Sequence, residues 1–220
     1  MHKEKILVIA PHHDDEILGC GGLIMKNTLA GSEVTVLVVA SGWTGVRKKI
    51  SKEEKIKLRE DECRKAGKIL GVKDFIFLRK EDQTIYADQN LQKELVKIIQ
   101  EINPSIVLAP HKDDSDFEHK IISSLVKEAA WLAKDAVLWP ELPPSDNLEK
   151  LLFYEVWAPL RRPNKFIDIS SEIEQKRKAM LQYQSQLSRR DYIGAIIGLN
   201  TFRGRLKGIE CAEAFEEKKL

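Results

Sequence analysis

Four short, continuous runs of apolar and β-branched residues most constrain how this chain can fold. They are KILVIA at 5–10, EVTVLVVA at 33–40, FIFL at 75–78 and SIVLA at 105–109. Continuous rather than alternating apolar runs are typical of strands that are covered on both faces, as in a parallel sheet. We therefore expect these runs to form the strands of a buried sheet.

The segments between the runs place their apolar residues at helical spacing. Helices are predicted at 17–29, 52–70, 91–102 and 119–133. A regular alternation of strands and helices is the pattern of an open, doubly wound sheet. The predicted fold class is therefore α/β, with a Rossmann-like, mostly parallel sheet.

The last third of the chain has a different character. LLFYEVW at 151–157 and FIDIS at 166–170 are predicted strands, followed by a long helix from about Ser171 to Leu187. From Arg189 onward we expect helix and turn. No linker composition separates this part, so we predict a single domain over residues 1–220 with an α-rich C-terminal elaboration.

Composition excludes several classes of protein. The 36 basic and 34 acidic residues give a net charge of +2, which provides no strong field for nucleic acid or anionic lipid. The three cysteines are far apart and form no CxxC pair, so a disulfide framework and a thiolate zinc site are both disfavoured. No apolar stretch approaches membrane-spanning length. We expect a cytoplasmic protein without nucleic-acid or membrane partners.

Two segments rich in histidine and aspartate follow the first and fourth predicted strands. They are PHHDDE at 11–16 and PHKDDSDFEH at 110–119. Ligands of open α/β sheets bind outside the carboxyl ends of the strands, where both segments fall. Taken singly, Asp14, Asp15 or Asp116 could simply cap the helix that follows. Taken together, the two segments favour a metal site.

The residue types favour a particular kind of metal chemistry. Two imidazoles and one carboxylate suit a borderline divalent ion and leave one coordination position open. An ion of this kind can lower the pKa of water to about 7. A carboxylate that does not bind the ion could then accept the proton. The adjacent Asp14 and Asp15 offer one ligand and one base.

A dinucleotide-binding loop is the competing interpretation of the segment after the first strand. Gly19-Cys20-Gly21-Gly22 resembles part of that fingerprint, but Ile24 occupies its third glycine position. The second strand also ends in Val-Ala-Ser without the acidic residue that would bind a ribose. We therefore expect these glycines to allow close packing of a helix on the sheet.

These motifs resemble those of the LmbE-like/PIG-L family of zinc-dependent de-N-acetylases. The family's (A/P)-H-P-D-D-E signature corresponds to PHHDDE at 11–16, and its D-x-H-x-D-H signature to DSDFEH at 114–119. The segments EVWAPLRRPNKFIDIS, YQSQL, FRG and AEAF also resemble its C-terminal half. The resemblance extends over most of the chain.

The resemblance implies hydrolysis of the acetamide of an N-acetylated amino sugar, such as an N-acetylglucosamine conjugate. It implies a Zn²⁺ ion, or another divalent metal, as cofactor, and a homo-oligomer, either a trimer or a hexamer. The implied metal ligands are His12, Asp15 and His119, with His13 as a less favoured alternative to His12, and Asp14 is the implied general base. Arg59 and Asp82 are expected in the sugar pocket. Arg203 is a weaker candidate for the pocket and could equally be a surface arginine.

Two positions depart from the family pattern. Asp116 stands where the family has a histidine that stabilises the oxyanion, and a carboxylate cannot do so unless it is protonated. Asp116 is thus expected in the substrate site, and His111 is the candidate to supply the missing donor. Glu118 replaces an aspartate and is expected to orient His119 through its second ring nitrogen.

Two other functions remain open. With Asp116 in the histidine position, the protein could be a catalytically weak module that binds a metal and a sugar or nucleotide-sugar. It could also be a metal-dependent phosphoesterase, with Asp113, Asp114 and Asp116 holding a second ion.

By default the tryptophans are expected in the core or at interfaces. Trp43 and Trp157, which follow strands, could instead face a sugar ring.

Overall fold

The computed structural model describes residues 3–135, 141–187 and 191–220. The strands are β1 (Lys5–Ala10), β2 (Glu33–Ala40), β3 (Asp74–Lys80), β4 (Ile106–Pro110), β5 (Lys150–Tyr154), β6 (Lys165–Asp168) and β7 (Ala212–Lys219). The helices are α1 (Asp15–Leu29), the 3₁₀ turn η1 (Trp43–Gly45), α2 (Lys52–Leu70), α3 (Gln89–Ile102), α4 (Phe117–Asp135), α5 (Ile173–Met180), α6 (Gln184–Leu187) and α7 (Tyr192–Arg205).

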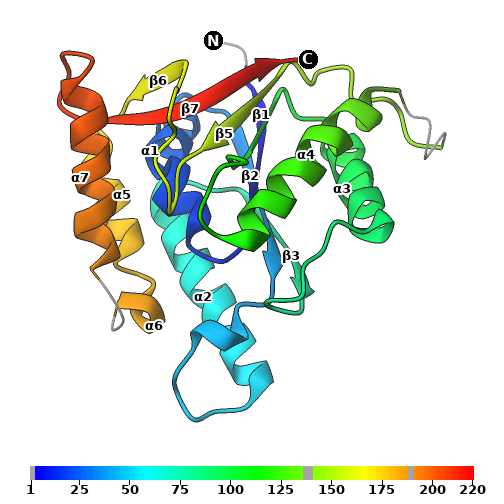
Figure 1. The fold of residues 1–220 in the computed structure, drawn as a ribbon, viewed down its shortest axis with the longest axis horizontal. Helices are drawn as coiled ribbons and strands as arrows, with labels where there is room; N and C mark the ends of the chain where they lie inside the picture. Colours follow the sequence, from blue (N-terminus) through cyan, green and yellow to red (C-terminus); the bar gives the residue numbers. More distant parts are fainter. Residues whose placement is uncertain (1–2, 136–140, 188–190) are drawn as a thin grey trace.

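The strands form one mixed sheet in the order β3-β2-β1-β4-β5-β7-β6 (Figure 1). β1 to β5 are all parallel to one another, and β7 runs antiparallel between β5 and β6. This arrangement confirms the predicted α/β class and the mostly parallel, doubly wound sheet. The strand order reverses between β1 and β4, so helices leave the sheet toward opposite faces on either side of this point.

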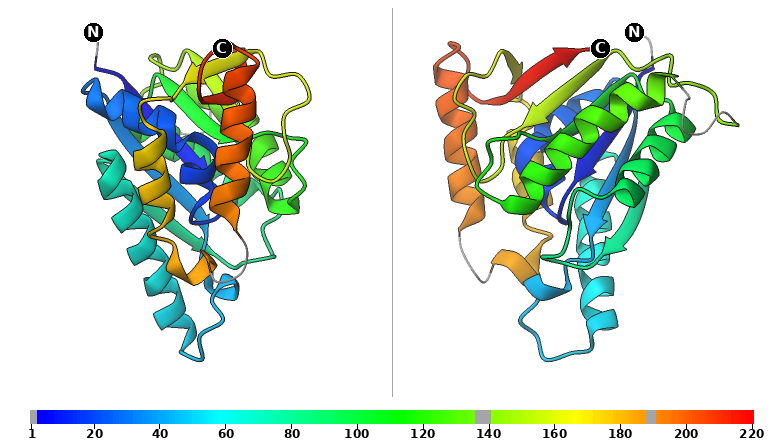
Figure 2. Two further views of the ribbon diagram at one scale, coloured as in Figure 1. Left: turned by 90° about the vertical axis from the view of Figure 1, so that its left-hand side faces the viewer. Right: turned by 45° about the vertical axis from the view of Figure 1, so that its right-hand side comes forward.

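Each face of the sheet has its own apolar core. Ile6 and Val8 of β1 pack with α1, α2 and α5, whereas Leu7 and Ile9 pack with α3 and α4. Figure 2 shows α3 and α4 together on one side, with α7 at the far end of the molecule. Because both faces of the sheet are buried, the sequences of the parallel strands are continuous apolar runs. Among the described residues, no helix combines the length and apolarity needed to cross a membrane.

The C-terminal segment differs from the prediction in two respects. The predicted helix over 171–187 is divided into α5 and α6, and the end of the chain forms β7 rather than only helix and turn; residues 188–190 lie outside the described part. The β7 sequence AEAFEEKK is rich in helix-favouring residues, which explains the wrong prediction. Pairing with both β5 and β6 outweighs that local preference.

A buried ion pair occupies a break in α1. Cys20 has non-helical backbone angles (φ −144°, ψ 23°), which free carbonyl and N–H groups in the middle of the helix. Lys176 Nζ donates to Leu18 O at 2.9 Å and to Glu213 Oε1 at 2.7 Å. The Glu213 carboxylate in turn accepts from the N–H groups of Gly22 and Leu23, both at 2.8 Å. The pair therefore caps both halves of α1 and ties them to α5 and β7.

Two glycines of α1 sit against bulky side chains. A Cβ atom on Gly19 would lie 2.2 Å from the Tyr154 ring, and one on Gly22 would lie 2.5 Å from Ile169. The Tyr154 hydroxyl donates to Ile9 O at 2.9 Å, so its ring cannot easily move aside. These contacts confirm that the glycines serve close packing of the helix.

Replacing Lys176 by Met should strongly destabilise the fold. The substitution leaves the fully buried Glu213 without its cationic partner, and losing one member of a buried pair costs about 3–5 kcal/mol. Urea denaturation followed by circular dichroism measures the change in the free energy of unfolding. Lys73→Met, which breaks an exposed pair with Glu33, is the matched control and should have little effect. Equal stabilities of the two variants would contradict the assigned role of the buried pair.

Candidate metal centre

The sheet topology brings the two histidine- and aspartate-rich segments together. β1 and β4 are parallel neighbours, with Ile6 paired to Ile106 and Val8 to Leu108. Both strands therefore end at the same edge of the sheet. The loop after β1 leads into α1 on one face, and the loop after β4 leads into α4 on the other. The crevice between these loops is the expected ligand site of an open α/β sheet.

Three side chains at this edge form a compact triangle of potential ligand atoms. His12 Nδ1 lies 3.4 Å from His119 Nε2 and 3.4 Å from Asp15 Oδ2. His119 Nε2 lies 3.1 Å from the same Asp15 oxygen. An ion with tetrahedral bonds of about 2.0–2.2 Å holds its ligand atoms about 3.3 Å apart, so the triangle fits such an ion. Asp15 Oδ1 is buried and has no hydrogen-bond partner among the described residues.

Asp116 offers a further oxygen at the edge of this triangle. Potential ligand atoms of His12, Asp116 and His119 all lie within 4.8 Å of one another, a wider spacing than that of the Asp15 set. Asp116 Oδ1 also accepts from the N–H groups of Glu118 at 2.8 Å and His119 at 3.4 Å, so it caps the start of α4. Asp15 Oδ2 likewise accepts a backbone N–H, that of His12, at 2.8 Å, so the structure offers Asp15 and Asp116 as alternative third ligands.

The outer ring nitrogens of both histidines face carboxylates. His12 Nε2 contacts Glu118 Oε2 at 2.7 Å, and Glu118 also accepts from Ile85 N at 3.2 Å. His119 Nδ1 lies 3.4 Å from Asp114 Oδ1. The expectation that Glu118 orients His119 is therefore wrong: Glu118 holds His12, and Asp114 takes the place beside His119. Carboxylates in these positions fix the ring orientation of metal-binding histidines.

The buried carboxylates control protonation at this cluster. Burial opposes the charged form of His119, but Asp15 and Asp114 outweigh it and raise the pKa of His119 to about 9. Burial likewise opposes charge on His12, while Asp15 and Glu118 raise its pKa well above the usual value. The same negative potential would attract a divalent cation, which would compete with these protons.

Asp14 lies next to the ligands but is held differently. It precedes α1, yet its side chain makes no capping hydrogen bond, and its backbone has the left-handed φ of 115°. A non-glycine residue at such a φ is strained, which is frequent at functional sites. Its carboxylate lies 3.3 Å from Arg59 Nη2. Burial raises the pKa of Asp14 to about 6, although Arg59 opposes this shift.

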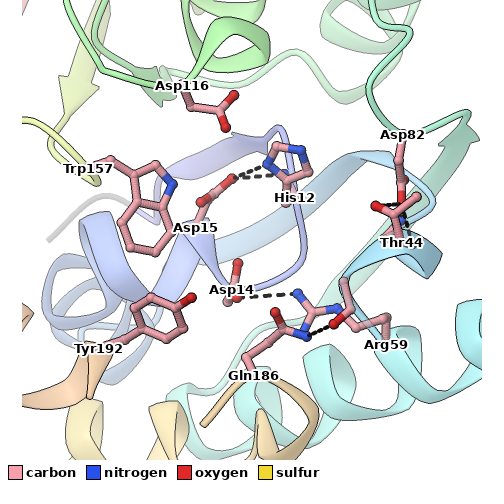
Figure 3. A pocket seen from close by; sticks show the side chains of 12 residues that line it. His12, Asp14, Asp15, Thr44, Arg59, Asp82, Asp116, Trp157, Gln186 and Tyr192 are labelled. Atoms are coloured by element: carbon pink, nitrogen blue, oxygen red, sulfur yellow. Dashed lines mark hydrogen bonds and ion pairs between the residues drawn. The ribbon is translucent and has the colours of Figure 1, made fainter. Parts of the chain in front are cut away.

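These residues border a cavity of about 240 Å³ (Figure 3). Its wall contains carboxylates, the guanidinium of Arg59, two aromatic rings and a glycine-rich loop. The lining residues are His12, Asp14, Asp15, Gly42, Thr44, Gly45, Arg59, Asp82, Asp116, Trp157, Gln186 and Tyr192. Arg59 is itself held by Ser185 Oγ at 3.3 Å, Glu62 at 3.5 Å and the carbonyl of His13.

Asp82 borders the cavity, but its carboxylate oxygens are engaged with the adjacent loop. Oδ1 accepts from Ser41 Oγ at 2.9 Å and Gly42 N at 2.6 Å. Oδ2 accepts from Thr44 N at 2.8 Å and Thr44 Oγ1 at 2.9 Å. Asp82 therefore organises the loop that forms this wall.

Two other candidates lie away from the cavity. The ring of His111 is buried, with Nε2 2.7 Å from Ala158 O and Nδ1 accepting from Asp113 N at 3.2 Å. Both nitrogens are occupied, which corrects the expectation that His111 supplies a donor to the substrate. Arg203 is also buried and pairs with Glu155 at 2.5 Å, so it is neither a pocket residue nor a surface arginine.

Sequence reasoning missed several residues of the cavity wall. Gln186 lies in the family-like segment YQSQL but was not named as a site residue, and Tyr192 carries no local signal; both reach the wall through the packing of α6 and α7. Trp157 was an alternative rather than a main candidate, and the structure places it on the wall. Trp43, the other alternative, donates to Glu81 at 2.8 Å and does not line the cavity.

Comparisons with known proteins agree with this geometry. Diacetylchitobiose deacetylase of Thermococcus kodakarensis is 31% identical over 196 residues, covering 83% of this chain and 70% of that protein. A probable N-acetyl-α-D-glucosaminyl L-malate deacetylase 2 of Bacillus anthracis is 27% identical over 114 residues, covering 49% and 50%. The inhibitor complex of N,N′-diacetylchitobiose deacetylase from Pyrococcus horikoshii superposes with a TM-score of 0.89 at 26% identity, covering 98% of this chain and 84% of that one.

The profile of the family described as PIG-L, GlcNAc-PI de-N-acetylase, matches residues 7–130. This span contains all three corners of the ligand triangle, His12, Asp15 and His119, together with Asp14. The chain belongs to the PIG-L family of GlcNAc-PI de-N-acetylases, as the sequence motifs predicted.

Proposed function

We propose that the protein is a metal-dependent deacetylase that hydrolyses the acetamide of an N-acetylglucosamine-type conjugate. The observation that carries this proposal is the triangle of His12, Asp15 and His119, with a second carboxylate, Asp14, beside it that is not one of the three corners. The three relatives described above, each named a deacetylase, support the same reaction.

His12, Asp15 and His119 would hold the metal ion. Two imidazoles and a carboxylate suit Zn²⁺, and other divalent ions can bind the same set. When bound, such an ion supplies a Lewis acid that polarises an amide carbonyl and lowers the pKa of water. Glu118 and Asp114 keep the two imidazoles oriented toward it.

Asp14 would serve as the general base. Its carboxylate accepts a proton from the attacking water, whose oxygen forms the new bond to the carbonyl carbon. The same proton is then delivered to the leaving nitrogen as the C–N bond breaks, which yields a free amine and acetic acid; the acid then loses its proton to the solvent and becomes acetate. A pKa of about 6 suits both transfers near neutral pH. Arg59 holds the carboxylate in place at 3.3 Å.

The structure favours one ion over the two that a phosphoesterase site often holds. Asp114 is fully buried, and its oxygens accept from Asp116 N and Trp157 N at 2.9 Å each. Neither Asp113 nor Asp114 lines the cavity. Assembly into trimers or hexamers, a single domain over residues 1–220 and a cytoplasmic location stay predictions.

Asp14→Asn should retain zinc but lose activity by about 10²–10⁴-fold, because the amide cannot accept the proton from water. His119→Ala should lose the metal, since it removes one of three ligands. Acetate release from N-acetylglucosamine conjugates measures the first effect, and zinc content per chain measures the second.

Asp113→Asn serves as the control, because Asp113 lies outside the cavity. It should match the wild type in both measurements. Full activity in Asp14→Asn would refute the assigned base. A wild-type protein that binds zinc but releases no acetate from any N-acetylated sugar would favour the binding-module alternative.

Zinc affinity should increase with pH. Although burial opposes charge on His119, Asp15 and Asp114 raise its pKa to about 9, so the imidazole carries a proton at neutral pH when no metal is bound. Zinc must displace that proton, and its affinity should therefore rise at least about tenfold per pH unit between about pH 7 and 9. Competition with a zinc-buffering chelator measures this slope. A pH-independent affinity would contradict the assignment of His119 as a ligand.

A further inference from the structure

We propose that Tyr183 is a positioning residue, which holds Asp14 in its working position through Glu16 and Arg59. This inference rests on the proposed function, in which Asp14 is the general base, and extends it to a residue of the C-terminal half. Tyr183 lies in the turn between α5 and α6 and is only 2% exposed. It does not line the cavity at the ligand triangle, so it acts on the reaction only through other side chains.

The position of Asp14 requires support from its surroundings. Its φ of 115° is in the left-handed region, which a non-glycine residue leaves unless neighbouring contacts hold it there. Relaxation to a common φ would rotate the backbone at this residue and move the carboxylate away from the ligand triangle. Two contacts oppose this movement. The Asp14 N–H donates to Glu16 Oε2 at 3.0 Å, and the carboxylate lies 3.3 Å from Arg59 Nη2 (Figure 3).

Tyr183 contacts the partners of both groups. Its hydroxyl donates to Glu16 Oε1, while the other oxygen of that carboxylate holds the Asp14 N–H. The guanidinium carbon of Arg59 lies 5.4 Å from the centroid of the Tyr183 ring, within the range of a cation–π contact. Arg59 also donates to the carbonyl of His13, the residue before Asp14. One phenol side chain therefore supports both the backbone and the carboxylate of Asp14.

Burial makes the hydroxyl contact important. Glu16 is fully buried in the first turn of α1, where a hydrogen bond is stronger than in water and an unpaired polar atom is costly. Cys63 Sγ lies 3.5 Å from the same Glu16 oxygen, but a thiol is a weak donor and does not replace the hydroxyl. The packing of α5 against α1 and α2 sets the position from which Tyr183 reaches Glu16.

Tyr183→Phe tests this role, because it removes the hydroxyl and keeps the ring. For the zinc-loaded protein we expect kcat to fall about 10–10²-fold, since misplacement of a reacting group by about 1 Å can cost about 10²-fold in rate. KM and zinc content should stay within about twofold of the wild type, because the substitution removes no ligand and no cavity residue. Acetate release from the methyl glycoside of N-acetylglucosamine gives both kinetic constants.

Tyr154→Phe is the matched control for the loss of a buried tyrosine hydroxyl. The Tyr154 hydroxyl donates to Ile9 O at 2.9 Å rather than to a neighbour of Asp14, so kcat should stay at the wild-type value. Three results would overturn the proposal: a wild-type kcat in Tyr183→Phe, an equal fall of kcat in both variants, or a loss of zinc in Tyr183→Phe.

Glu16→Ala tests the connection between the hydroxyl and the Asp14 backbone. It removes the acceptor of the Asp14 N–H directly, so kcat should fall at least as far as in Tyr183→Phe. Residues that act through one contact have non-additive effects, and the double variant should therefore be no slower than Glu16→Ala alone. Losses that multiply in the double variant would contradict a role of the hydroxyl through Glu16.

Crystal structures of the wild type and Tyr183→Phe separate this inference from the proposed reaction. If the wild type hydrolyses neither this glycoside nor any other N-acetylated sugar, the proposed function fails, but the position of Asp14 can still be compared. We expect the Asp14 carboxylate to move in Tyr183→Phe while His12 and His119 keep their places. An Asp14 with unchanged φ and an unchanged distance to Arg59 would overturn the inference.

Discussion

The parallel pairing of β1 with β4 is the constraint on which the rest of the structure depends. Its register, with Leu7 opposite Val107, ends both strands at one edge of the sheet. Because the strand order reverses there, the following helices diverge to opposite faces and leave a crevice between their first turns. His12 and His119, 107 positions apart in the chain, meet in that crevice. A shift of one residue in this register would separate them and reverse the faces of β4.

The crevice concentrates buried charge, which destabilises a fold unless each group has a partner. The structure supplies these partners from outside the cavity. Glu118 contacts His12, Ser185 donates to Glu62, and Tyr183 donates to Glu16. Burial raises the pKa of Glu16 to about 7. Such a dense set of perturbed, mutually supported groups is typical of a functional site rather than of a structural core.

Sequence reasoning succeeded where local pattern and topology decide the outcome. The apolar runs predicted the parallel strands, and the rule that ligands bind at the carboxyl ends of the strands predicted that residues 11–16 and 110–119 lie at one site. It failed where side-chain geometry decides. Spacing alone cannot tell that Glu118 turns toward His12 or that the nitrogens of His111 are already occupied. It also failed for β7, whose partners are distant in the chain.

The N-terminal part of the chain provides the candidate metal ligands and one side of the cavity wall, and the C-terminal part provides the other side. The family profile spans residues 7–130, which include every candidate metal ligand and Asp14. Trp157, Gln186 and Tyr192 lie beyond it, on a loop and on helices that pack against the N-terminal half. The ligand triangle therefore depends on the parallel sheet, whereas one side of the wall depends on the C-terminal packing. Substitutions in that packing can change which conjugate fits without moving the ligand triangle.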